Sequence, residues 1–303
     1  MTERVLEPAY ASFSDAVEAV LAHIHQRLGS TLTMFTRVDG ERWRLLHVLD
    51  YGYGVEPGTE LRWDDSICSQ MVQGLGPRIA PAVATIPAYV DQPIRRALPI
   101  GTYAAVPLTR PDGTLFGTLC AISPRENLPE ITDDLAMLEM NARLLGRLID
   151  AELSAGALRR ANRLFSAPRE VSGAVSAEVW TEALGTEDAE VRGLGSRAEI
   201  VSVSLHTAPT GAQAADVTAA LRAVLPPDAL VARPTDTEFA ALVVDGSAGT
   251  EPVASLRRLL DALAVRSDVT IVRPEPGEEL AACWLRARGG GPDDERTHDR
   301  GAA

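Results

Sequence analysis

The sequence predicts a mixed α/β protein in which a long helix connects two domains. Segments with strand-like alternation are interleaved with helical segments in both halves of the chain. Residues 130–165 between them carry an uninterrupted helical pattern. The length of 303 residues suits two domains of roughly 100–200 residues each. Hydrophobic residues make up 46% of the chain and aromatic residues only 5%, so aliphatic side chains must fill both cores.

The first half begins with a predicted helix over residues 12–28, which Ser12 or Ser14 can cap and Gly29 ends. Two predicted strand pairs follow, TLTMFTRV with RWRLLHVLDYG and TYAAVPL with LFGTLCAIS, each joined by a turn. Between the pairs, Ser66 and the residues before it offer a cap for a short helix. This order predicts an antiparallel sheet with flanking helices.

Residues 130–165 predict one long helix that pairs with a second copy as a coiled coil. Its apolar residues follow heptad spacing: Leu135, Leu138, Ala142, Leu145, Ile149, Leu153, Ala157, Ala161 and Leu164. Arginines such as Arg143 and Arg159 lie outside this seam. The alternative is a single helix that packs on its own domain. We expect a homodimer through residues 131–165, and Pro168 ends the helix.

The second half alternates helices and strands in another order. Helical patterns occur in 176–184, AADVTAALRAVL, VASLRRLLDALAV and GEELAACWLRAR, and strand patterns in EIVSVSLHT, ALVARPTDTEFAALVVDG and DVTIVRP. They predict an α/β sandwich, followed by a polar tail that we expect to be disordered. The predicted parts are therefore residues 1–129, a helix over 130–167, residues 168–288, and a tail over 289–303.

Charge and cysteine usage exclude several classes of function. With 29 basic and 42 acidic residues, the net charge of −13 disfavours binding to nucleic acids and to anionic membranes. No run of about 18 apolar residues could span a membrane. The three cysteines are too widely spaced for a disulfide scaffold or a zinc site. We expect a cytoplasmic protein without a metal, a nucleic-acid partner or a membrane partner.

Three segments carry a resemblance to a known family: SICSQMVQGLGPRIAPAV, PAYVDQPIRRALPIGTYAAVPL and DGTLFGTLCAISP. They resemble a subgroup of GAF domains in bacterial sensor proteins, and with the flanking helices the match covers residues 10 to 150. The resemblance implies a GAF fold, a cytoplasmic location and a pocket on one side of the sheet. No cofactor is expected, and the ligand would be an unknown small molecule.

Seven residues fall where such a pocket would be lined: Trp63, Cys68, Met71, Tyr89, Tyr103, Phe116 and Cys120. Ligand pockets are mostly apolar with a few polar groups, but packing in a core explains each of these residues equally well. Cys68 and Cys120 also suggest thiol-based redox sensing, although Asp64 and Asp65 oppose a reactive thiolate. Relatives that reduce methionine sulfoxide use several cysteines here, and this chain has too few in matching places.

Residues 171–288 resemble a GGDEF domain, a family that joins two GTP molecules into cyclic di-GMP. The resemblance rests on VSGAVSAEVWTEAL, GAQAADVTAALRAVL and LVARPTDTEFAALVV. The signature itself reads Thr235, Asp236, Thr237, Glu238 and Phe239. Both glycines that would let the backbone approach phosphates are replaced. Thr237 and Ser204 stand where the family has metal-binding carboxylates, so the resemblance implies a catalytically inactive domain.

These observations predict a non-enzymatic signal-transduction protein. A GAF domain would sense a small molecule or a partner and relay the change through a dimeric helix to a degenerate GGDEF domain. One alternative is residual diguanylate cyclase activity, or nucleotide binding without catalysis, motivated by the retained Glu238 and Asp216. A second alternative is a thiol-based redox sensor.

Overall fold

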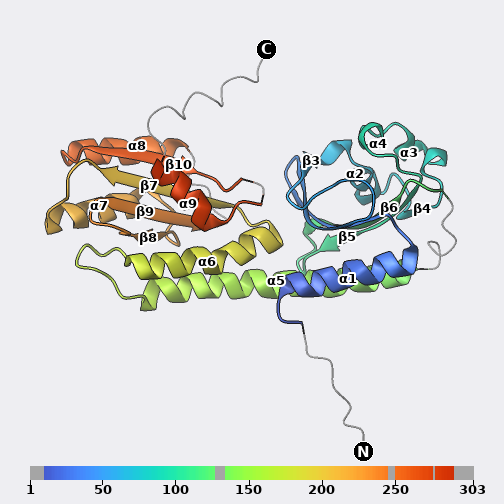
Figure 1. Ribbon diagram of the computed structural model, residues 1–303, viewed down its shortest axis with the longest axis horizontal. Coiled ribbons are helices and arrows are strands. Elements are labelled where there is room, and N and C mark those ends of the chain that lie inside the picture. Colours follow the sequence, from blue (N-terminus) through green and yellow to red (C-terminus); the bar gives the residue numbers. More distant parts are fainter. Residues whose placement is uncertain (1–9, 127–133, 245–249, 276, 290–303) are drawn as a thin grey trace, which may run out of the picture. The chain divides into compact units, whose positions relative to one another are not determined.

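The computed structural model describes residues 10–126, 134–244, 250–275 and 277–289. It divides into two compact units, Met1–Ser154 with Gly193–Gly195, and Ala155–Arg192 with Ser196–Ala303. Each unit contains an antiparallel sheet with helices, as the predicted mixed α/β class requires (Figure 1). Within the described residues, no helix is long and apolar enough to cross a membrane.

The sheet of the first unit has six strands in the order β3-β2-β1-β6-β5-β4, and the neighbouring strands are antiparallel. The strands are β1 (Leu32–Asp39), β2 (Arg42–Asp50), β3 (Glu60–Arg62), β4 (Ile79–Ala80), β5 (Thr102–Thr109) and β6 (Leu115–Ser123). The crossover from β3 to β5 contains the short helices η1 (Trp63–Asp65), α2 (Ile67–Val72), η2 (Val83–Thr85), α3 (Pro87–Val90) and α4 (Ile94–Ala97). The helix and two strand pairs that the sequence predicts are therefore present.

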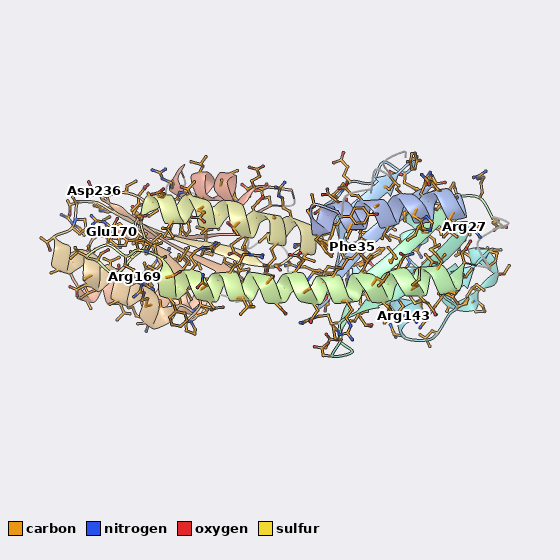
Figure 2. The ribbon with its side chains drawn as sticks, turned by 90° about the horizontal axis from the view of Figure 1, so that it is seen from below. Arg27, Phe35, Arg143, Arg169, Glu170 and Asp236 are labelled. Carbon is orange, nitrogen blue, oxygen red and sulfur yellow. The ribbon has the colours of Figure 1, made fainter. Side chains whose placement is uncertain are left out.

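Helices α1 (Phe13–Leu28) and the first part of α5 (Leu135–Ser166) pack against one face of this sheet (Figure 1). Ser12 caps α1 by accepting a hydrogen bond from the Asp15 amide at 3.1 Å. Arg27 lies near the other end of α1 (Figure 2). It pairs with Asp134, just before α5, at 3.0 Å. The opposite face of the sheet is covered by the crossover helices.

The predicted coiled-coil seam is wrong over the first part of α5. Leu138, Ala142, Leu145 and Ile149 are at most 4% exposed and belong to the core of their own unit. Heptad spacing and the stripe of a helix that packs on a sheet coincide over a few turns, so the sequence did not separate them. The alternative of a helix that packs on its own domain holds for this stretch.

The second unit is built around a four-stranded sheet of order β10-β7-β9-β8, antiparallel throughout. Its elements are α6 (Ala177–Leu194), β7 (Ala198–Leu205), α7 (Gly211–Val224), β8 (Leu230–Ala232), β9 (Glu238–Val244), α8 (Thr250–Ala262), β10 (Ser267–Val272) and α9 (Leu280–Gly289). From β7 to β10 the order is βαββαβ, the split arrangement known from ferredoxin-like folds. Helices α7 and α8 pack on one face, and α6 and α9 on the other (Figure 1).

Several predicted boundaries move in the structure. Helix α6 runs ten residues beyond the expected end at 184, to Leu194. Helix α9 ends at Gly289, one residue into the predicted tail. Residues 130–133 of the predicted long helix and 290–303 of the predicted tail lie outside the described residues. The domain limits at 129, 167 and 288 stay predictions.

Candidate functional site

Six of the seven predicted pocket residues lie together on the face of the first sheet that the crossover covers. Five of them are buried: Cys68, Met71, Tyr89, Tyr103 and Cys120. Trp63 is partly buried and packs against the same cluster. These six side chains therefore share one face of the sheet, and their role in lining a ligand pocket stays a prediction.

Local structure explains how the chain brings them together. Ser66 caps α2 by accepting a hydrogen bond from the Ser69 amide at 3.0 Å. Three residues apart, Cys68 and Met71 project from one side of α2. In the sheet, Tyr103 pairs with Ile122 and Cys120 with Ala105, so the Tyr103 and Cys120 side chains are diagonal neighbours on one face.

Phe116 is a correction to the predicted site. It belongs to the core on the opposite face of the sheet, with α1 and α5. The register of β5 and β6 shifts here, because Thr109 pairs with Leu115 while Leu108 pairs with Gly117. Phe116 is the extra residue of this β-bulge, so its side chain leaves the alternation that would have aimed it at the predicted pocket.

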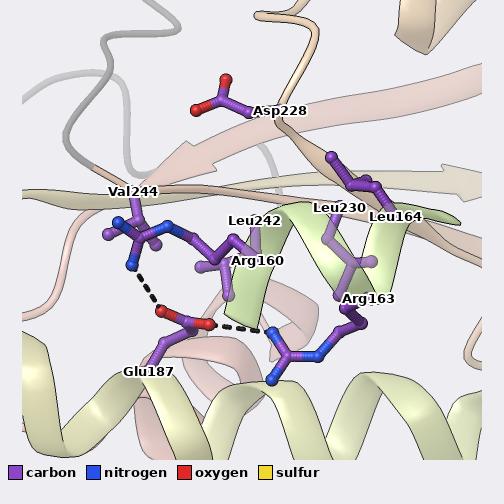
Figure 3. A pocket seen from close by; sticks show the side chains of 8 residues that line it. All are labelled: Arg160, Arg163, Leu164, Glu187, Asp228, Leu230, Leu242 and Val244. Carbon is purple, nitrogen blue, oxygen red and sulfur yellow. Dashed lines mark hydrogen bonds and ion pairs between the residues drawn. The ribbon is translucent and has the colours of Figure 1, made fainter. Parts of the chain in front are cut away.

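The clustered side chains pack against one another, and two hollows of the described structure lie away from them. One is lined by Glu41, Arg42, Glu60, Leu61 and Arg62 at the outer edge of the first sheet. The other is in the second unit, beside Arg160, Arg163 and Glu187 (Figure 3). Neither is lined by a residue of the cluster.

A chain of polar groups runs through this otherwise apolar core. The sulfur atoms of Cys68 and Cys120 lie 3.1 Å apart, and the Tyr103 hydroxyl donates to Cys68 Sγ at 3.5 Å. On the other side, Cys120 Sγ lies 3.0 Å from Thr118 Oγ1. Thr118 Oγ1 lies 2.8 Å from Thr36 Oγ1, to which Trp43 Nε1 donates at 2.9 Å. Thr36, Thr118 and Trp43 were not predicted from the sequence as part of the site. The signal for the two threonines was a hydroxyl residue at an inward position of a strand.

The two cysteines differ in their acidity. Burial opposes ionisation of Cys68, but hydrogen bonds from Cys120, Tyr103 and Thr118 outweigh it and lower the pKa of its thiol. Burial raises the pKa of Cys120 well above its usual value, and the neighbouring Cys68 raises it further. Burial also raises the pKa of the Tyr103 hydroxyl, so this group stays protonated as a donor. Within the pair, Cys68 is the thiol that ionises first.

The segment that resembles a degenerate GGDEF signature, residues 235–239, runs from the turn after β8 into the start of β9 in the second unit. Glu238 begins β9 and pairs across the sheet with Ser204 of β7, which in turn pairs with Asp268 of β10. The Glu238 carboxylate accepts hydrogen bonds from Thr235 Oγ1 at 3.0 Å and from Arg288 Nε at 2.8 Å. Its charge is therefore already paired within the protein.

The remaining predicted residues of this region are dispersed. Asp236 has a side chain that is 95% exposed, whereas Phe239 is buried in the core. Asp216 is exposed on α7. Among the residues that the structure describes, no group of three or more His, Cys, Asp or Glu side chains could hold a metal ion.

A buried ion-pair cluster lines the hollow of the second unit. Glu187 of α6 accepts from Arg160 and Arg163 of α5, both at 2.8 Å, and Glu190 lies 3.0 Å from Arg160 (Figure 3). The side chains of the two glutamates are 2% and 3% exposed. Because each guanidinium already faces a carboxylate, this cluster holds α5 against α6 and leaves little positive charge for an anionic ligand.

Comparison with known proteins identifies the first half. Residues 12–149 match the sequence model of the GAF domain family. The chain therefore contains a GAF domain, which is typical of proteins that sense and transduce signals. None of the curated proteins matches the chain. The resemblance of residues 171–288 to GGDEF domains stays a prediction.

Three solved structures are similar to part of the chain. The type II free methionine-R-sulfoxide reductase of Thermoplasma acidophilum is 17% identical over 44% of this chain and 89% of its own, with a TM-score of 0.36. The free methionine-R-sulfoxide reductase of Neisseria meningitidis, in complex with its substrate, is 19% identical over 48% and 83%, with a TM-score of 0.39. The phytochrome photosensory core module of Stigmatella aurantiaca is 12% identical over 64% and 44%, with a TM-score of 0.41.

Proposed function

We propose that this chain is a cytoplasmic, non-enzymatic signal-transduction protein. Its GAF domain senses a small molecule or a partner protein and passes the change along α5 to a pseudo-GGDEF domain. The observation that carries this proposal is the family match over residues 12–149 combined with the course of α5. This one helix begins in the core of the GAF domain, where Leu138 and Leu145 are buried, and continues to Ser166.

An exposed apolar stripe on α5 supports a homodimer. Residues 144, 148, 151, 155, 158, 162 and 165 alternate in steps of four and three, the spacing of a two-stranded coiled coil. All of them are apolar except Asn162, and all are exposed except Ala155, which is half-buried. Leu144, Leu148, Leu158 and Phe165 in this stripe are 58%, 43%, 71% and 91% exposed. We assign the dimer contact to this stripe, in place of the seam that packs inside the unit. A paired helix with two arrangements can couple a sensor to an output.

Two features support a second domain that is GGDEF-like but inactive, one in its fold and one in its site residues. The βαββαβ order of the second unit is compatible with the resemblance to GGDEF domains. Thr237 and Ser204 cannot replace metal-binding carboxylates, and Arg288 neutralises the retained Glu238. We assign this domain the role of a docking surface for a downstream protein.

Sedimentation of the full chain at micromolar concentration tests the relay. We expect the wild type to be a dimer. Leu158→Glu should raise the dissociation constant of the dimer at least tenfold, because a carboxylate replaces an apolar contact. A tenfold change corresponds to about 1.4 kcal/mol. The matched control is Ala157→Glu, at an exposed neighbour that lies in the seam predicted from the sequence but outside the stripe. A monomeric wild-type chain, or equal loss in both variants, would refute the dimer contact assigned here.

A further inference from the structure

The fold brings two thiols that are 52 residues apart in the sequence into direct contact. Cys68 lies on α2 and Cys120 on β6, and their sulfur atoms are 3.1 Å apart. They are 2% and 1% exposed. A disulfide has a sulfur–sulfur distance of about 2.05 Å, so bond formation requires the sulfur atoms to approach by only about 1 Å. The third cysteine, Cys283, belongs to the second unit.

We propose that Cys68 and Cys120 form a peroxide-oxidisable dithiol that closes to an intramolecular disulfide inside the GAF domain. The oxidant class follows from burial. A disulfide such as oxidised glutathione is too bulky to reach sulfur atoms in a packed core, whereas hydrogen peroxide is close to water in size. Transient opening of the short crossover helices over the cluster admits such a molecule.

The surroundings assign different roles to the two sulfur atoms. Cys68 is the second residue of α2, and it receives the hydroxyl hydrogen bond of Tyr103. The hydrogen bonds with Cys120 and Tyr103 lower the pKa of Cys68 despite its burial, so Cys68 supplies the thiolate. The pKa of Cys120 is raised, so Cys120 keeps its proton until the second step. The other titratable groups that face the pair are the hydroxyls of Tyr103 and Tyr89.

The reaction balances in two steps. The Cys68 thiolate attacks one oxygen of hydrogen peroxide, the O–O bond breaks, and the departing hydroxide takes up a proton as water, leaving a sulfenic acid. Cys120 sulfur then attacks the Cys68 sulfur, the S–O bond breaks, and the thiol proton of Cys120 leaves with the hydroxyl group as a second water. Two thiols are oxidised and one peroxide is reduced.

The bond would fix α2 to β6 in the core of the sensor domain. The disulfide deepens the proposed function, because it makes peroxide an input of the GAF domain. The role of the disulfide as a signal rests on the proposed sensor function. Formation of the bond itself does not depend on dimerisation. A chain that oxidises but stays monomeric would refute the relay alone, and a dimer that does not oxidise would refute the dithiol alone.

Mass spectrometry of the full-length wild-type chain after peroxide treatment is the test. Free thiols are blocked with an alkylating reagent before digestion. We expect loss of two of the three thiols, a mass decrease of two hydrogens before alkylation, and a cross-linked peptide pair containing Cys68 and Cys120. Cys283 should stay reduced, because burial raises the pKa of its thiol to about 12.

Variants and a pH series separate this chemistry from incidental oxidation. Cys68→Ser should abolish the two-thiol loss, and Cys120→Ser should leave a sulfenic acid on Cys68 that a dimedone-type probe labels. The oxidation rate of the wild type should rise with pH, and the midpoint of this rise should lie below the usual cysteine pKa. Tyr103→Phe should move that midpoint to a higher pH. Wild-type cysteines that stay reduced, or a Cys68 that passes to sulfinic acid without the cross-link, would overturn the proposal.

Discussion

The polar groups between Trp43 and Tyr103 are stable in an apolar core because each group has a partner. Thr36 shows this most clearly. Its hydroxyl donates to the Thr118 carbonyl at 3.0 Å and accepts from the Thr118 amide at 3.1 Å and from Trp43 Nε1 at 2.9 Å. Leaving one such buried group unpaired would cost about 1–3 kcal/mol. The network therefore fixes β1 against β6 and presents the two sulfur atoms at its other end.

The close approach of β6 to β1 depends on one residue without a side chain. A Cβ placed on Gly117 would fall 2.6 Å from the Thr36 carbonyl carbon and 2.9 Å from Arg37 Cα. Both are backbone atoms, which cannot rotate away. We expect Gly117→Ala to destabilise the protein by about 1–3 kcal/mol through overpacking, measured by urea denaturation.

Gly185→Ala is the matched control for Gly117→Ala. Gly185 lies within α6, and a Cβ there meets nothing within 4 Å. Alanine favours a helix over glycine, so this variant should gain about 0.5–1 kcal/mol. Equal effects of the two substitutions would contradict the steric explanation.

Only some of the site residues could be predicted from the sequence. Resemblance to the family grouped Cys68, Tyr103 and Cys120 as lining residues of one pocket, and the structure places the three side chains in one cluster. The grouping failed at Phe116, because a bulge is a feature of strand pairing that the sequence of one strand does not reveal. The partners Thr36 and Trp43 come from other strands, so only the folded register shows that they complete the network.

Helix α5 shows the same limit for a whole element. The sequence predicted its helical state, and α5 is observed over Leu135–Ser166. It did not predict which apolar stripe faces the sheet, since two stripes are present. Two adjacent leucines belong to different stripes: Leu145 is 1% exposed and Leu144 is 58% exposed. Tertiary packing makes the choice between the stripes.

This pair of leucines provides a prediction at the scale of the helix. Leu145→Ala should destabilise the GAF domain by about 2–5 kcal/mol, because it leaves a cavity in the core. Leu144→Ala changes an exposed position, so we expect a change in stability within about 0.5 kcal/mol in dilute monomer. Thermal and chemical denaturation at low protein concentration measure both. If Leu144→Ala cost as much as Leu145→Ala, the orientation of α5 described here would be wrong.

At the scale of the whole chain, the order of elements was largely predictable. Two α/β units and a long helix follow from periodicity and turn residues alone. Long-range pairs were not predictable. Arg288 lies 50 residues after Glu238, and nothing in the spacing of α9 indicates that its side chain reaches the signature. The resemblance to GGDEF domains predicts which carboxylates are missing, and the structure adds that the Glu238 carboxylate is already paired.

The proposed inactivity of the second unit can be tested with GTP, and the Arg288–Glu238 pair indicates which variants to use. Joining two nucleotides requires metal ions that carboxylates hold, and Thr237 and Ser204 cannot supply them. We expect no cyclic dinucleotide from the full-length chain incubated with GTP and magnesium or manganese, as measured by chromatography with mass detection. Replacing the missing carboxylates by Ser204→Asp with Thr237→Asp, and freeing Glu238 by Arg288→Ala, should increase metal binding measured by calorimetry. Product from the wild type that Glu238→Ala abolishes would instead establish a residual cyclase, and the non-enzymatic role would fail.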